Sequence, residues 1–193
     1  KIINDFRAGN LKASEVFDSD KVISWLAITD LFGAYHGSCF TNIKLVYDRN
    51  LDKLYPIVWD AFSENIFSST TFSRHKMFKL NWVFDFYNSL CPSKTEMTTQ
   101  MLLDPEIIEK YLAKLDEVTS PGYVDNVMRT IEPEVSKYMN ILNLEYPQFK
   151  IEDEIRRLKD NAKYLRNVYL YPPIPFNAYL SSNNNQDSLI LVN

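Results

Sequence analysis

ITDLFGAYHGSCFTNIKLVYDRNLDKLYPIVWD, residues 28–60, decides the fold of this 193-residue chain. Its apolar beginning predicts the last turns of a buried helix, which we expect to end at Gly33. Ile43, Leu45 and Tyr47 then alternate with Lys44 and Val46. Over 54–58, Leu54, Pro56 and Val58 alternate with Tyr55 and Ile57, and this period of two predicts strands. The polar turn Asp48–Asp52 lies between the two strands and makes them an antiparallel hairpin.

Asn42 opens the first strand of this hairpin and Asp60 closes the second. A hairpin brings its two ends together, so an amide and a carboxylate are predicted to share one small site. Mg²⁺ prefers such oxygen ligands, and kinase-type sites hold the metal with an Asn and with an Asp beyond the following strands. An Asp at a strand end is also common as a simple cap or turn former, so spacing alone leaves both interpretations open.

The chain before residue 28 is predicted to be helical. Residues 1–18 begin with a short helix that breaks at Gly9-Asn10. Asp18 or Ser19 is placed to cap a second helix, Asp20–Phe32. Because this second helix is apolar on nearly every side, we expect it to be buried on most of its surface.

After residue 60 the sequence predicts first an irregular stretch and then a series of helices. Residues 61–99 predict a loop with one or two short elements. Helical signals then follow: Asp104-Pro105 as a start, Ser120-Pro121 as a second start, and Pro133 as an interruption or restart. A last helix is predicted over Ile151–Val168, and the apolar stripes of all these helices are expected to be core.

The C-terminal part, residues 173–193, is predicted to be a β-ribbon or the start of a following, truncated domain. Its strand-like pieces, 177–180 and 188–192, flank a polar turn. The chain begins at Lys1 rather than Met, and we expect it to be a segment of a longer protein.

Composition excludes several classes of protein. A hydrophobic content of 46% allows a sizeable core. With a net charge of −4 and no basic cluster, long nucleic acids are not expected partners. No apolar run reaches the roughly 18 residues of a membrane span.

Two motifs of other protein classes are missing from the sequence. Cys39 and Cys91 lack a CxxC pattern and predict two thiols or a single disulfide. There is no GxSxG elbow, so a common hydrolase is not supported.

Three segments together resemble the spore-coat protein H (CotH) kinase family, a divergent protein-kinase-like group of spore coats and bacterial cell-surface proteins. They are Leu31–His36, Thr41–Leu45 and Leu54–Asp60. The resemblance covers roughly residues 1–172, including the later helices. It implies an α+β fold: a mostly helical, kinase-like C-terminal lobe with a short antiparallel hairpin.

The resemblance also implies a function, which is protein phosphorylation with ATP and Mg²⁺ at a secreted or bacterial cell-surface location. Asn42 and Asp60 match the family's metal-binding residues, which also contact the nucleotide phosphates. At the catalytic position the family has an Asp, whereas this chain has His36, and Asp30 lies earlier, within the predicted helix. The partners would be ATP and a protein phosphoacceptor.

Two departures define the alternative to an active kinase. The imidazole of His36 can accept a proton but cannot replace a carboxylate as a hard Mg²⁺ ligand. With four glycines in total, the chain has no Gly-rich phosphate-covering loop, so it resembles a C-terminal lobe without the nucleotide-gripping half. The alternative is therefore a catalytically inactive pseudokinase that acts as a surface or scaffold domain.

Overall fold

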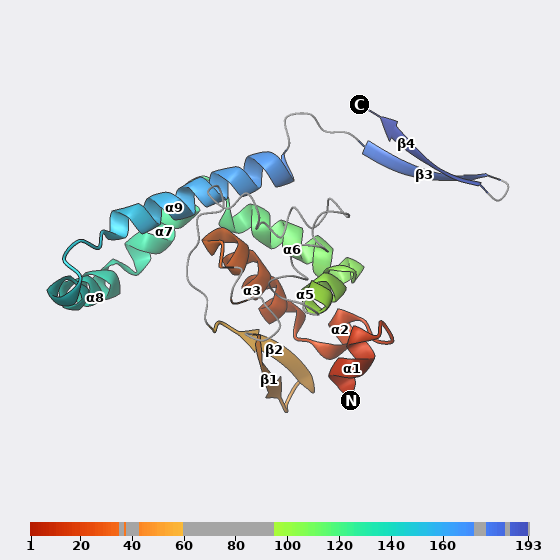
Figure 1. Ribbon diagram of the computed structural model, residues 1–193, viewed down its shortest axis with the longest axis horizontal. Coiled ribbons are helices and arrows are strands. Elements are labelled where there is room, and N and C mark those ends of the chain that lie inside the picture. The colour runs from red at the N-terminus through yellow and green to blue at the C-terminus, as the bar shows by residue number, and fades with distance from the viewer. Residues whose placement is uncertain (35–36, 38–42, 60–94, 172–176, 184–185, 193) are drawn as a thin grey trace.

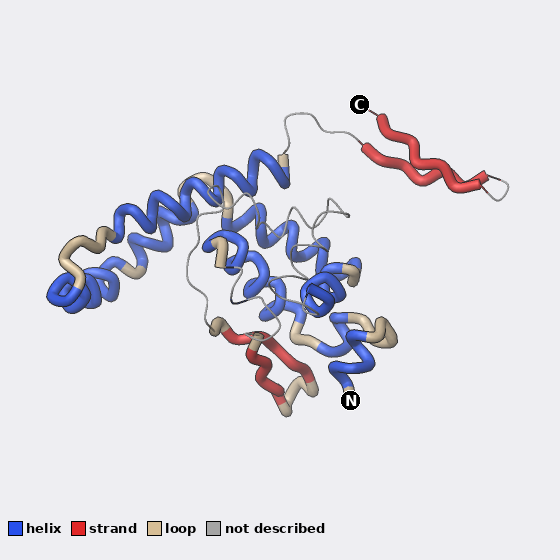
Figure 2. The backbone as a smooth tube through the Cα atoms, viewed as in Figure 1, coloured by secondary structure: helices blue, strands red, loops and turns tan. Residues whose placement is uncertain are grey.

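The computed structural model describes residues 1–34, 37, 43–59, 95–171, 177–183 and 186–192 (Figures 1 and 2). The helices in these ranges are α1 (Ile2–Arg7), α2 (Ala13–Val16), α3 (Ser19–Phe32), α5 (Thr95–Leu102), α6 (Pro105–Val118), α7 (Tyr123–Thr130), α8 (Glu132–Glu145) and α9 (Ile151–Tyr164), which continues as the π-helical segment η3 (Leu165–Leu170). The strands are β1 (Lys44–Asp48), β2 (Lys53–Ile57), β3 (Asn177–Asn183) and β4 (Gln186–Val192). The predicted α+β class is thus confirmed, with helices predominating.

Helix α3 is the centre of the core. Asp18 is its N-cap and accepts a hydrogen bond from the Lys21 amide, and Gly33 ends it in the left-handed conformation with φ of 64°. Its buried side chains point to every side of the helix, as the sequence predicts: Val22, Ile23, Trp25, Leu26, Ala27, Thr29, Asp30 and Leu31. Helix α6 packs along one side of α3, and β2 and α9 contact it elsewhere.

The hairpin β1–β2 pairs antiparallel, with Lys44 opposite Ile57 and Asp48 opposite Lys53. Both strands and the turn between them agree with the prediction. Pro56, which cannot donate to a ladder, lies on β2 opposite Leu45. The sheet is two-stranded within the described ranges, so the outer edge of β2 has room for this residue.

The N-terminal helices are joined to α6 by one carboxylate. Asp104 is the N-cap of α6, and Pro105 follows at the first helical position, as predicted. The same carboxylate accepts hydrogen bonds from the Ser14 amide at 2.8 Å and from the Ser14 hydroxyl at 2.7 Å. Asp104 therefore caps one helix and at the same time holds α2 against it.

Two helices were not anticipated from the sequence. Helix α2 is only four residues long, too short to show a period. Helix α5 falls partly in a stretch that predicts a loop, yet its Met97 and Met101 are fully buried. Its sequence TEMTTQML mixes Thr and Gln with few apolar residues, so its helical signal is weak and tertiary packing decides its conformation.

The later helices follow the prediction with three corrections. Ser120-Pro121 does not start a helix: the Tyr123 amide donates to the Ser120 carbonyl in a tight turn, and α7 begins after Gly122 at φ of 84°. The final helix is α-helical only to Tyr164 and then widens into η3. There the Arg166 guanidinium donates to a carboxylate oxygen of Asp116 on α6 at 2.6 Å.

Helix α8 corrects the prediction that every apolar stripe is core. Pro133 does restart the chain there, at the first turn of the helix. None of the residues of α8 is buried, however. The helix lies at the far end of the arm formed with α7 and α9, away from α3 (Figure 1). A periodic stripe shows which side of a helix is apolar, but not whether a partner covers it.

The C-terminal strands form the predicted ribbon. Asn177 pairs with Val192 and Asn183 with Gln186 in an antiparallel ladder, which is longer than the sequence pattern indicates. The ribbon lies apart from the helices in Figure 2. In the described part of the chain, no helix has the length and apolar character required to cross a bilayer.

Asp104 predicts a specific dependence of stability on pH. Burial alone would raise its pKa, but hydrogen bonds from Ser14 and the Glu106 amide outweigh burial and hold the pKa of Asp104 below its ordinary value. A depressed folded-state pKa stabilises the fold above the unfolded-state pKa, and this stability is lost as the pH falls below about 4. In denaturant titrations, Asp104→Asn should lower the free energy of unfolding at pH 7 and flatten its fall below about pH 4.

An exposed carboxylate provides the control for this prediction. Asp160→Asn on α9 should change the free energy of unfolding at pH 7 little, because the Asp160 side chain is exposed. Equal profiles for wild type and Asp104→Asn would contradict the role assigned to Asp104.

Candidate functional site

The candidate site is framed by two described parts of the chain: the end of α3 at Gly33, from which the chain continues towards β1, and the β1–β2 hairpin. The predicted site residues His36, Asn42 and Asp60 lie outside the described residues. The two cysteines, Cys39 and Cys91, lie outside them as well. The structure describes the elements that flank these positions in the sequence, namely α3 and the β1–β2 hairpin. We call these elements the frame of the site.

The hairpin supplies the first part of the frame. Its register sets Lys44 opposite Ile57, and in the sequence Asn42 precedes Lys44 by two positions while Asp60 follows Ile57 by three. The two strands therefore bring together the chain segments that lead to the predicted ligands. Whether the two side chains share one ion remains a prediction.

The turn of the hairpin is tightly organised at its other end. The Asp48 carboxylate accepts a hydrogen bond from the Asn50 amide at 2.9 Å. The Tyr47 hydroxyl donates to Asp52 at 2.7 Å, and this hydrogen bond raises the pKa of Tyr47. Asp52 has φ of 53°, a conformation that Asp tolerates better than most residues. These contacts fix the register that the site requires.

The hairpin is also attached to the helices. The Lys53 ammonium donates to the Ser14 carbonyl at 2.9 Å and to the Glu15 carbonyl at 2.5 Å, at the end of α2. The Asp18 amide donates to the Leu54 carbonyl at 2.8 Å. Strand β2 is therefore fixed to the start of α3, and the hairpin keeps one orientation relative to the helical core.

The end of α3 supplies the second part of the frame. Asp30 is fully buried, and the Tyr111 hydroxyl of α6 donates to its carboxylate at 2.5 Å. This position confirms that Asp30 belongs to the helix. Its carboxylate holds α3 to α6 three residues before Gly33, so we assign Asp30 a structural role.

Asn161 of α9 holds the same end of α3 from another side. Its side-chain amide donates to the Leu31 carbonyl at 3.0 Å, which satisfies one of the carbonyls left free at a helix end. Asn161 is fully buried, and its Oδ1 atom has no hydrogen-bond partner among the residues that the structure describes.

Sequence reasoning missed Asn161 because the predicted stripe of α9 was read from apolar residues alone. Asn161 lies three residues after Leu158 and four before Leu165, and both of these residues are buried. Helical spacing therefore puts Asn161 on the buried side. A polar residue on the apolar side of a predicted helix is the sequence signal that indicates such a buried contact.

The surface beside the site is apolar and carries a cation. Val58 is 68% exposed and Trp59 is 55% exposed at the end of β2. The Lys44 ammonium lies 6.0 Å from the centre of the Trp59 ring, at the outer limit of a cation–π contact. The Trp59 ring could stack on a planar ring of a ligand, and the Lys44 ammonium could contact an anionic group of the same ligand.

Metal binding is not visible in the part of the chain described. There, no three His, Cys, Asp or Glu side chains gather into a group that could hold an ion. The proposed ligands Asn42 and Asp60 lie outside these ranges, and their role stays a prediction.

The contact between Tyr111 and Asp30 predicts a loss of stability. Tyr111→Phe removes the hydroxyl that donates to a buried carboxylate, so the free energy of unfolding should fall by about 1–3 kcal/mol. Tyr138→Phe on α8 is the matched control, because Tyr138 is 63% exposed, and it should change the free energy little. Equal unfolding midpoints in urea for Tyr111→Phe and wild type would contradict the prediction.

Comparisons with protein-family models, with curated proteins and with solved structures find no match to this chain.

Proposed function

We propose that this chain is the C-terminal lobe of a CotH-type, kinase-like domain that binds ATP and Mg²⁺ for protein phosphorylation. Asn42 and Asp60 would hold the metal, and the metal would neutralise the phosphate charge. His36 would lie at the catalytic-loop position. The acceptor would be a protein, and the family resemblance favours a secreted or bacterial cell-surface location.

The observation that carries the proposal is the hairpin register. Lys44 and Ile57 lie opposite each other, and in the sequence Asn42 precedes Lys44 by two positions while Asp60 follows Ile57 by three. This pairing supports a shared site, because two oxygen ligands can bind one ion only if the chain segments that supply them lie close together. The exposed residues that directly follow β2, Val58 and Trp59, also suit a nucleotide or a covering lobe.

His36 favours a second candidate function, which is that of a catalytically inactive pseudokinase. A kinase uses an Asp as catalytic base, and this chain has His36 in that place. Asp30 is not a substitute, because it is buried in α3 and accepts a hydrogen bond from Tyr111. The second candidate is therefore a pseudokinase that retains the metal ligands and acts by binding.

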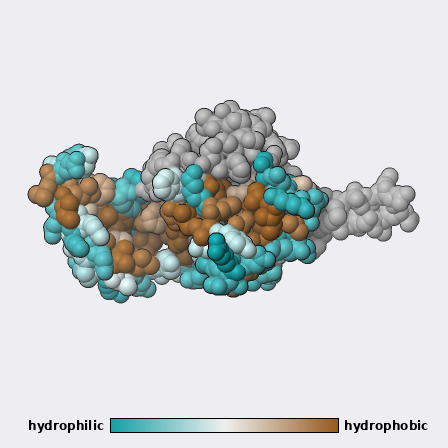
Figure 3. Space-filling view, turned by 90° about the horizontal axis from the view of Figure 1, so that it is seen from below, coloured by the Kyte–Doolittle hydropathy of each residue, from teal (hydrophilic) through white to brown (hydrophobic). Residues whose placement is uncertain are grey.

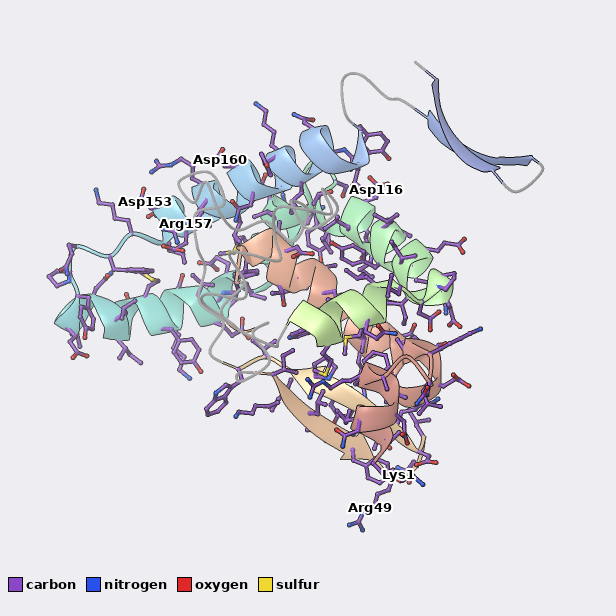
Figure 4. The ribbon with its side chains drawn as sticks, turned by 45° about the vertical axis from the view of Figure 1, so that its right-hand side comes forward. Lys1, Arg49, Asp116, Asp153, Arg157 and Asp160 are labelled. Carbon is purple, nitrogen blue, oxygen red and sulfur yellow. The ribbon has the colours of Figure 1, made fainter. Side chains whose placement is uncertain are left out.

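Binding is tested with the full-length protein. We expect Mg-ATP to raise its melting temperature in a concentration-dependent manner, since a ligand that binds only the folded state stabilises it. Asp60→Ala should abolish most of this rise by removing a metal ligand. Asp160→Ala on α9, an exposed carboxylate outside the site (Figure 4), should behave as wild type. An unchanged melting temperature for the wild type would refute the proposal.

Catalysis separates the two candidates. Restoring the family's acid with His36→Asp should raise phosphate transfer from radiolabelled ATP by roughly hundredfold if the missing general base limits the reaction. The protein itself and casein serve as acceptors. The pseudokinase candidate predicts no transfer by the wild type, whereas equal transfer by wild type and His36→Asp would show that His36 supports catalysis. Mg-ATP binding without transfer in either protein would exclude the kinase candidate.

A further inference from the structure

Helix α8 is apolar on two sides. Its half-buried residues Val135, Met139 and Leu142 share one side of the helix at the spacing of an α-helix. A second set lies on a different side and is open to solvent: Tyr138 is 63% exposed, Ile141 is 59% exposed and Leu144 is 87% exposed. We call Tyr138, Ile141 and Leu144 the outer ridge of α8.

The outer ridge lies at an accessible place. Helix α8 is at one end of the molecule (Figure 1), and Figure 3 shows hydrophobic side chains at that end. Single exposed apolar residues are normal on protein surfaces. The three exposed residues of the outer ridge instead follow one another at every third position of one helix, and Tyr146 nearby is also 47% exposed. Together they form the kind of apolar patch that marks an interaction site.

The charges beside the outer ridge show what fits it. Lys137 precedes Ile141 by four residues, and Glu145 follows it by four. Both are exposed, and neither makes a salt bridge within the described ranges. The Lys137 ammonium instead lies 5.6 Å from the centre of the Tyr138 ring.

This pattern is complementary to itself when reversed. In two antiparallel copies of α8 related by a two-fold axis at Ile141, each residue before Ile141 faces the equally distant residue after it. Lys137 then faces Glu145 of the second copy, and Tyr138 faces Leu144. The two Ile141 side chains meet on the axis. A two-fold interface requires such self-complementarity.

We propose that the outer ridge of α8 binds the outer ridge of a second copy of this chain, as an antiparallel helix pair centred on Ile141. Each interface forms two Lys137–Glu145 pairs around an apolar centre. A pair of 14-residue helices makes a small contact, so the dimer is weak and depends on concentration. Self-association through α8 does not depend on nucleotide chemistry.

Sedimentation velocity on the full chain, from micromolar to millimolar concentration, tests the proposal. Wild type should shift from monomer to dimer, and Ile141→Glu should stay monomeric, because two like charges would meet on the axis. Leu103→Glu, at a residue 67% exposed between α5 and α6, is the control and should dimerise as wild type. Thermal melts by circular dichroism should match for all three proteins, since both substitutions are at exposed positions.

Charge reversal tests the antiparallel register. Lys137→Glu and Glu145→Lys should each weaken dimerisation by roughly tenfold, because each places like charges opposite one another twice. Mixed together, the two variants should associate at least as well as wild type, since one has Glu and the other Lys at both positions. High salt should reduce these differences.

Three results would overturn the proposal. They are a wild type that remains monomeric at every concentration, an Ile141→Glu variant that dimerises as wild type does, and a mixture of the charge variants that shows no recovery. The first would mean that a different protein or no protein covers the ridge. The third would exclude the antiparallel pairing of Lys137 with Glu145.

Discussion

The structure depends on one constraint, which is that α3 is buried on nearly every side and must be surrounded. A helix without a polar side stabilises the fold only when several neighbours exclude water from it. Helix α6, helix α9 and strand β2 supply these neighbours. The polar groups at the end of the helix are also paired, by Tyr111 to Asp30 and by Asn161 to Leu31.

The same constraint organises the candidate site. Because the end of α3 is held by α6 and α9, the helix ends at a fixed point, Gly33. Because Lys53 and Asp18 attach β2 to the helices, the hairpin has a fixed orientation as well. A site that needs ligands from two segments requires such rigid support. The proposed kinase-like chemistry therefore rests on a frame that packing has already determined.

Sequence patterns predicted the elements that carry strong local signals. The all-round apolar pattern of α3, the alternation of β1 and β2, and the Asp104-Pro105 start of α6 each have one clear structural meaning. Helix α5 has no such signal, since Thr and Gln interrupt its apolar positions, and only packing makes it helical. The two-sided pattern of α8 was ambiguous because periodicity identifies an apolar side without identifying what covers it.

The candidate site was less predictable, for a physical reason. Asn42 and Asp60 are predicted from their chemistry and spacing, and His36 from the family resemblance. Asn161 instead acts through a contact with Leu31, from a helix 130 residues away in sequence. Such contacts depend on how helices pack in three dimensions. Local spacing therefore identified the candidate ligands, and only the structure identified one of the residues that support them.

Three side-chain hydrogen bonds that hold the helices of this fold together join residues distant in sequence. Ser14 and Asp104 are 90 positions apart, Asp30 and Tyr111 are 81 apart, and Leu31 and Asn161 are 130 apart. Each contact closes a long loop, whose entropy cost must be met before the contact stabilises the chain. Folding should therefore be slow for a helical protein, because its rate depends on contact order more than on helix formation.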